Sequence, residues 1–195
     1  MVSKEKINEF IRRAYKTACE HGFHDEERSD AHWMMLVISE IGEMVEADRK
    51  NRHTIYSAVA YCDVYKEELN EKSWATYFER DVKDTLEDEL ADVLIRMFDF
   101  CGTMGVEPLM TDNGIVDMSD AFERLYGNST LTEQCFCLAD LVTDVADSKD
   151  LPRDTGVVMA FCFEFARHHK IDIEWHIEHK MAYNESRPNK HGKGY

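Results

Sequence analysis

Apolar and acidic side chains recur with helical spacing in the stretch Leu86-Glu87-Asp88-Glu89-Leu90-Ala91-Asp92-Val93-Leu94-Ile95. Its apolar members return every three or four residues, which places them on one face of an α-helix. The pattern extends in both directions, and we expect a helix from about Trp74 to Cys101, with Gly102 as its stop. Glu89 and Asp92 lie three residues apart at the edge of the apolar face, whereas Glu87 points into it. The helix therefore presents a pair of carboxylates beside its buried side.

A second acidic pair lies in Ser39-Glu40-Ile41-Gly42-Glu43-Met44-Val45-Glu46-Ala47, within a helix predicted from Ser29 or Asp30 to about Arg49. On a helical wheel Glu40 falls on or beside the face that should enter the core, and Glu43 lies close to the same direction. A carboxylate in the core is costly unless it is paired, protonated or bound to a metal ion. The alternative is that these glutamates lie at a solvated edge of the helix.

The rest of the chain also favours helices, because only three prolines interrupt long helical periodicity and few segments alternate as strands do. Further helices are predicted at Ser3–His21, Tyr56–Leu69, Ser119–Leu125, Thr130–Ser148, Pro152–Lys170 and Asp172–Ser186. The segment from Gly102 to Met118 is predicted to be a loop, with a turn signal at Asn113-Gly114. We therefore expect a single all-α domain over residues 1–195, a helical bundle with extra C-terminal helices.

The composition excludes several classes of protein. The 195 residues include 23 Lys and Arg against 39 Asp and Glu, which gives a net charge of −16. Such a surface repels nucleic acid, and an acidic protein that handles phosphates usually needs a bridging cation. No apolar stretch approaches the ~20 residues of a membrane helix, and the first residues do not resemble a signal peptide. Most of the six cysteines have apolar neighbours, so we expect reduced thiols in a cytoplasmic protein that binds neither membrane nor nucleic acid.

Two antiparallel helices that each present a carboxylate pair at one level would form a cluster of oxygen ligands. This ligand set suits Mg²⁺ or Mn²⁺ rather than zinc or copper. A ferritin-like di-iron centre would need Glu-x-x-His pairs, and neither acidic motif contains one. His176 and His179 have no matching Cys or His elsewhere, so we expect them at the surface. The candidate metal ligands are Glu40, Glu43, Glu89 and Asp92.

Taken together, the two motifs resemble a known family. Ser39–Ala47 followed by Glu89-Leu90-Ala91-Asp92-Val93 looks like the E-x-x-E … E-x-x-D signature of the MazG-like, all-α nucleoside triphosphate pyrophosphohydrolases. The stretch Lys180–Pro188, with Lys190-His191-Gly192-Lys193 behind it, is similar to the ending of one MazG-like branch. The resemblance covers about residues 32–99 and the final helix with its tail, and it does not extend to residues 102–172.

This resemblance implies a function. Members of the family use Mg²⁺ to cleave a nucleoside triphosphate, NTP or dNTP, between its α and β phosphates, which yields the monophosphate and pyrophosphate. The motif positions assign the metal ligands and the catalytic carboxylates to Glu40, Glu43, Glu89 and Asp92. Family members pair their bundles, so we expect a homodimer or a higher homo-oligomer. The alternative is a non-catalytic regulatory protein of the same fold, because binding of nucleotide and Mg²⁺ would use the same ligands.

The linker between the two acidic pairs is longer than the family's, because it contains an additional segment at residues 51–78. This segment is rich in Tyr and Trp, as at Tyr56, Tyr61, Tyr65, Trp74 and Tyr77. We expect it to cap the pocket or to form an interface.

Basic and aromatic residues are candidates for binding the nucleotide. Lys and Arg are natural partners of phosphates, and an aromatic ring can stack on a nucleobase. The candidates in the final helix and the basic tail (187–195) are Lys180, Tyr183, Asn184, Arg187, Lys190 and Lys193. Trp33, with His32 beside it, precedes Glu40 by about two turns on the same side of its helix. A core position for Trp33 and a solvated tail end for the last two lysines are the alternatives.

Overall fold

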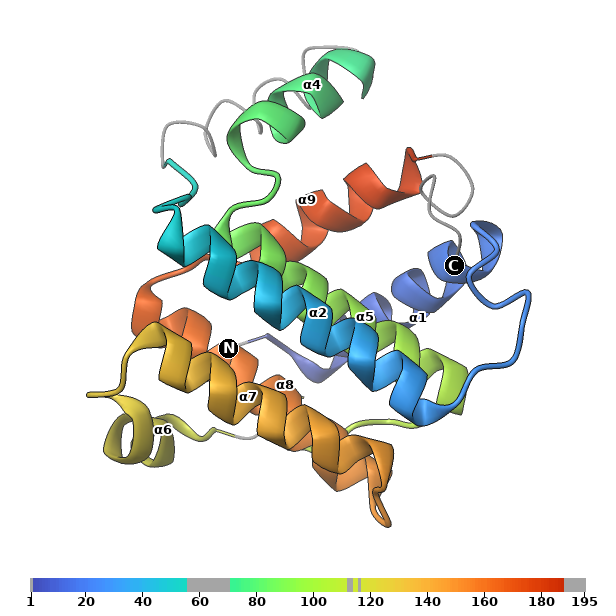
Figure 1. Cartoon of the computed structure of the whole chain (residues 1–195). Coiled ribbons are helices and arrows are strands. Elements are labelled where there is room, and N and C mark those ends of the chain that lie inside the picture. Colours follow the sequence, from blue (N-terminus) through green and yellow to red (C-terminus); the bar gives the residue numbers. More distant parts are fainter. Residues whose placement is uncertain (1, 56–70, 112–113, 116, 188–195) are drawn as a thin grey trace.

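The computed structural model describes residues 2–55, 71–111, 114–115 and 117–187. Within these ranges almost all regular structure is helical, which confirms the all-α prediction (Figure 1). The helices are α1 (Lys4–Glu20), α2 (Asp30–Arg49), α4 (Glu71–Asp81), α5 (Leu86–Met104), α6 (Ser119–Tyr126), α7 (Leu131–Ala146), α8 (Leu151–His169) and α9 (Ile173–Glu185). None of these helices has the length and apolar composition that crossing a bilayer requires. The helix predicted at Tyr56–Leu69 and most of the basic tail lie outside the described residues.

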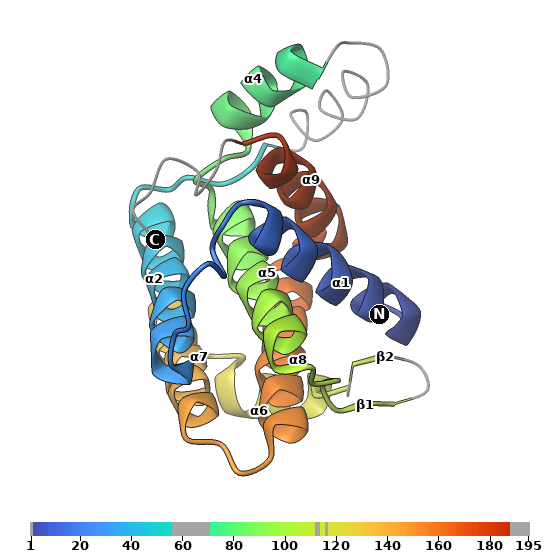
Figure 2. The ribbon, with the colours of Figure 1, turned by 90° about the vertical axis from the view of Figure 1, so that its right-hand side faces the viewer.

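Helix α5 forms the centre of the bundle, with α2 on one side and α1 and α9 on the other (Figure 2). Helix α8 also packs against α5, and α7 packs along α2. A helix with neighbours on several sides must be apolar around most of its circumference. The fully buried apolar residues of α5 include Leu90, Val93, Leu94, Met97 and Phe98. A polar stripe at helical spacing follows the remaining side of α5 and carries Glu89, Asp92, Arg96 and Asp99.

The prediction of one continuous helix from Trp74 to Cys101 is wrong, because two helices share this segment. Helix α4 ends at Asp81 and α5 begins at Leu86. Between them Asp84 has a left-handed backbone with a φ of 60°, and the side chain of Thr85 caps α5 by accepting a hydrogen bond from the N–H of Asp88. The apolar spacing from Phe78 to Leu86 continues across this turn, which explains why periodicity alone indicated a single helix.

Gly102 does not end α5, which continues to Met104 and ends at Gly105. Gly105 has a φ of 63°, the left-handed conformation that commonly closes a helix. Gly102 has a packing role instead, because a Cβ atom there would lie 2.5 Å from the Cβ of Tyr15 on α1. The missing side chain lets α1 lie directly against α5.

The segment predicted to be a loop between Gly102 and Met118 contains a short antiparallel hairpin. Its strands are β1 (Met110–Thr111) and β2 (Gly114–Ile115), with Met110 opposite Ile115. Gly114 has a φ of 110°, and a Cβ atom there would lie 2.1 Å from the carbonyl oxygen of Val2. The hairpin therefore holds the start of the chain beside the bundle.

Helix starts agree with the sequence-based predictions at two N-caps. The side chains of Ser3 and Ser29 accept hydrogen bonds from backbone N–H groups in the first turns of α1 and α2. Helix α4 packs on α9 through a separate small core of Trp74, Phe78, Val82 and Tyr183. This core attaches the described part of the aromatic segment 51–78 to the last helix.

Candidate functional site

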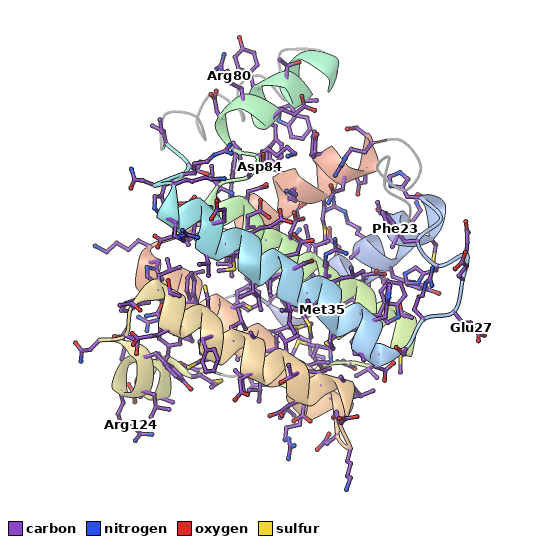
Figure 3. The ribbon with its side chains drawn as sticks, in the orientation of Figure 1. Phe23, Glu27, Met35, Arg80, Asp84 and Arg124 are labelled. Atoms are coloured by element: carbon purple, nitrogen blue, oxygen red, sulfur yellow. The ribbon has the colours of Figure 1, made fainter. Side chains whose placement is uncertain are left out.

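A pocket of about 190 Å³ lies between α1, α2, α5 and α9. The turn before α5 and the loop after α1 complete its wall through Asp84 and Phe23, both labelled in Figure 3. Helices α2 and α5 run in opposite directions, as the colours of Figure 1 show. Glu40 on α2 therefore lies opposite Arg96 on α5, and the polar stripe of α5 forms one wall of the pocket.

Three of the four predicted carboxylates come together at one end of this pocket. Glu40, Glu89 and Asp92 each offer a carboxylate oxygen, and these oxygens lie within 4.8 Å of one another. Glu40 is 5% and Glu89 is 3% exposed, so the solvated-edge alternative does not hold for either. Glu43 lines the same pocket from an exposed position on α2 and is not part of the group of three.

Two cations contact the carboxylates. Arg96 Nε donates to Glu40 Oε1 at 2.5 Å. Lys180 on α9 donates to Asp92 Oδ2 at 2.8 Å and also pairs with Asp88. No ion pair or hydrogen bond to Glu89 or Glu43 is present within the described part of the chain. The group therefore contains more carboxylates than cations.

The Asp88–Lys180 pair is buried in the interior of the protein. Asp88 is 0% and Lys180 is 3% exposed. Asp88 Oδ2 also accepts the N–H of Asp84, whereas Asp88 Oδ1 has no hydrogen-bond partner. Burial lowers the pKa of Lys180, but the two carboxylates raise it more, and the net shift of this pKa is upward. The ammonium group thus stays charged and joins α9 to the first turn of α5.

The acidic end of the pocket is electrostatically unbalanced. Burial, together with the neighbouring charge of Asp92, raises the pKa of Glu89 to about 9. Burial also raises the pKa of Glu40, although Arg96 opposes the rise. Carboxylates in this situation are either protonated or neutralised by a cation. A hard divalent cation such as Mg²⁺ or Mn²⁺ fits, because Glu40, Glu89 and Asp92 offer three carboxylate oxygens that lie close enough together to share one ion.

Only some of the predicted nucleotide-binding residues lie at the pocket in the structure. Trp33, Asn184 and Arg187 line the pocket. Lys180 lines it as well, but its ammonium is engaged by Asp88 and Asp92. Tyr183 is buried in the small core, where it stacks on Phe78 and donates its hydroxyl to Glu79. His32 packs edge-on against Trp33 and does not line the pocket, and Lys190 and Lys193 lie outside the described residues.

The prediction that His176 and His179 lie at the surface is wrong. They are 4% and 6% exposed, because the face of α9 that carries them is turned inward. His179 stacks on Trp175 with ring centroids 3.9 Å apart, and burial lowers the pKa of His176 to about 4. Among the described residues, neither histidine belongs to a group of metal-ligating side chains.

The structure also accounts for Glu87, which the helical wheel directs toward the apolar face. Its carboxylate accepts the N–H of Thr54 at 2.9 Å and lies 3.3 Å from the His53 ring. Glu87 therefore ties the segment after α2 to the start of α5.

Several residues of the site are not predicted from the sequence, among them Arg96, Asp99 and Asp88. Arg96 and Asp99 look like members of an ordinary polar face of a helix, yet both line the pocket. Asp88 follows a Thr N-cap by three residues, a position in which an acidic residue is common and draws no notice. Its partner Lys180 is 92 residues away in the chain, so no local signal connects the two.

Comparison with known proteins does not assign this chain to a family. No protein-family model, curated protein or solved structure matches this chain.

The buried pair predicts a large effect of removing one partner. Lys180→Met should lower the free energy of unfolding by about 3–5 kcal/mol, because Asp88 would remain buried without a counter-charge. Urea unfolding followed by circular dichroism measures this change. The double variant Asp88→Asn/Lys180→Met should regain much of the loss, since the orphaned charge is removed together with its partner. A loss of under about 0.5 kcal/mol in Lys180→Met would show that the pair does not hold α9 in place.

Proposed function

We propose that this chain is a Mg²⁺-dependent nucleoside triphosphate pyrophosphohydrolase, with Mn²⁺ able to replace Mg²⁺. The observation that carries the proposal is the buried group of Glu40, Glu89 and Asp92 at one end of a pocket that arginine and lysine side chains also line. The resemblance of the two acidic motifs to the MazG-like family supports the same assignment. The substrate would be an NTP or dNTP, and the products its monophosphate and pyrophosphate.

Each group in the pocket has a part in this proposal. Glu40, Glu89 and Asp92 would hold the cation, which when bound supplies charge neutralisation for the phosphates and activation of water. Arg187 and Lys83 line the pocket and would bind phosphate oxygens, for which Lys83 would exchange its ion pair with Asp84. The base and sugar would then extend along the pocket toward Trp33.

Glu43 is suited to accept the proton of the attacking water. It is exposed at the pocket, and no described residue forms a hydrogen bond or ion pair with it. The oxygen of water bonds to the α-phosphorus, the bond from this phosphorus to the bridging oxygen breaks, and pyrophosphate leaves with that oxygen. The proton released by water passes to the Glu43 carboxylate.

Pyrophosphate release from a panel of NTPs and dNTPs with Mg²⁺ tests the proposal. Activity should require the divalent cation and should be abolished in Glu40→Gln and Glu89→Gln, because each loses an anionic ligand. Glu46→Gln is the matched control on α2, since Glu46 is exposed and lies outside the pocket. It should keep the wild-type rate.

The outcomes separate the alternatives. Nucleotide binding without any pyrophosphate release would favour the non-catalytic regulatory protein. Failure of every nucleotide to bind in the presence of Mg²⁺ would overturn the proposal altogether.

The proposal includes a cytoplasmic homodimer. Buried free thiols at Cys101, Cys135 and Cys162 support a reducing compartment. Met35 on α2 and Phe136 on α7 are 57% and 74% exposed on two helices that pack together, and a partner would bury them. Sedimentation velocity at micromolar concentration should show a dimer, and a monomer would contradict this part of the proposal.

A further inference from the structure

The end of the pocket opposite the carboxylate group contains a further carboxylate, the partly buried Asp99. It lies on α5 seven residues, or two helical turns, beyond Asp92, which separates the two by ~10 Å along the helix. Asp99 lines the same pocket with its side chain 17% exposed. The proposed function gives it no role in metal or phosphate binding.

Asp99 is held by one neighbour and keeps one oxygen available. Asp99 Oδ1 lies 2.8 Å from His24 Nε2, which donates to the carboxylate. The His24 ring is fixed in turn between Trp33 and Tyr15, with ring centroids 5.0 Å and 5.4 Å away. Within the described part of the chain, no hydrogen bond engages Asp99 Oδ2. A fixed acceptor is therefore left for a ligand.

The surroundings of Asp99 suit a flat aromatic ligand. Trp33, Phe23 and Ile95 line the pocket together with Asp99, and Trp33 contacts the histidine that holds it. Aromatic side chains stack on nucleobases with little regard to sequence, so stacking alone would not distinguish one base from another. Discrimination requires a hydrogen-bonding group, and Asp99 is the carboxylate available at this end of the pocket.

The hydrogen-bonding capacity of a carboxylate determines which bases would bind beside it. An ionised carboxylate only accepts hydrogen bonds, so the ligand must donate. Cytosine and adenine carry an exocyclic amino group, whereas uracil and hypoxanthine carry a carbonyl oxygen at the same position. A carbonyl oxygen facing the carboxylate would leave two acceptors unpaired, which is costly. The ring N–H beside that carbonyl in uracil and hypoxanthine can still donate, so a preference for the amino base is expected and not exclusion of the carbonyl base.

We propose that Asp99 is the specificity-determining residue of this pocket, and that it selects nucleotides whose base presents an exocyclic amino group over their carbonyl counterparts. The inference rests on the proposed function, because it takes the acidic end of the pocket as the place of the phosphates. His24 is a positioning residue that fixes which oxygen of Asp99 faces the ligand.

Binding of non-hydrolysable α,β-methylene analogues to the whole chain with Mg²⁺ tests the inference independently of catalysis. The CTP analogue should bind about 10- to 100-fold more tightly than the UTP analogue, the difference that one hydrogen bond to a charged group makes. The ATP and ITP analogues should differ in the same direction. Isothermal titration calorimetry measures all four affinities.

The variant Asp99→Asn sharpens the test. With the amide oxygen accepting from His24, the amide NH₂ takes the place of Oδ2 and offers a donor, so the preference should invert toward UTP and ITP analogues. Asp120→Asn, at an exposed position of α6, is the matched control and should keep the wild-type preference. Affinity for inorganic tripolyphosphate should be equal in all three proteins, which shows that the phosphate end is intact.

The results distinguish failure of the base-selection proposal from failure of the proposed function. Tight binding of all four analogues without discrimination, or an unchanged preference in Asp99→Asn, would overturn the inference and leave the proposed function standing. Failure of tripolyphosphate and of every analogue to bind would overturn both.

Discussion

The buried ammonium of Lys180 links the two parts of the chain on which the pocket depends. It pairs with Asp88 in the first turn of α5 and with Asp92 one turn later, which places α9 along the polar stripe of the central helix. Without that contact α9 would face the buried carboxylate of Asp88 and the partly buried carboxylate of Asp92 with no counter-charge. The position of α9 in turn brings Asn184 and Arg187 to the pocket, so the interaction that organises the C-terminal helix also completes the wall of the site.

Antiparallel packing of α2 and α5 determines the order of groups along the pocket. Ascending residue numbers on α5 run from Glu89 through Asp92 to Asp99, while on α2 they run the other way, from Trp33 to Glu40. The acidic groups therefore gather at one end, and the aromatic groups with Asp99 gather at the other. A nucleotide has the same polarity, with charged phosphates at one end and a flat base at the other. Because of this match, one pocket can hold both the phosphates and the base of a nucleotide in the proposed function.

The sequence predicts the helices well because their apolar periodicity and their N-caps at Ser3 and Ser29 are local signals. It also predicts the three grouped carboxylates, because Glu40 and Glu89 are acidic residues at the edge of apolar faces, whereas Glu43, the fourth that it predicts, stays outside the group. It does not predict the turn before α5, since the apolar spacing from Phe78 to Leu86 continues across it.

Long-range pairing explains the remaining misses. Lys180 looks like a phosphate ligand until its contacts with Asp88 and Asp92 are known, and those contacts depend on how α9 packs. His176 and His179 look like surface residues because the low amphipathicity of α9 gives no indication of which face turns inward. Asp99 likewise becomes a candidate for recognition only when His24 and Trp33 are seen beside it.

We propose that Glu40, Glu89 and Asp92 form a site for a divalent cation. Burial and the charge of Asp92 raise the pKa of Glu89 to about 9, so at pH 7.5 this group holds a proton that a bound cation must displace. Calorimetric titration with Mg²⁺ at pH 7.5, in two buffers of different ionisation enthalpy, measures the protons released on binding. We expect release of about one proton per Mg²⁺ in the wild type. Glu89→Gln should lose this release and bind Mg²⁺ more weakly, whereas the exposed control Glu174→Gln should not change. Equal Mg²⁺ affinity and equal proton release in wild type and Glu89→Gln, or no binding at all, would contradict it.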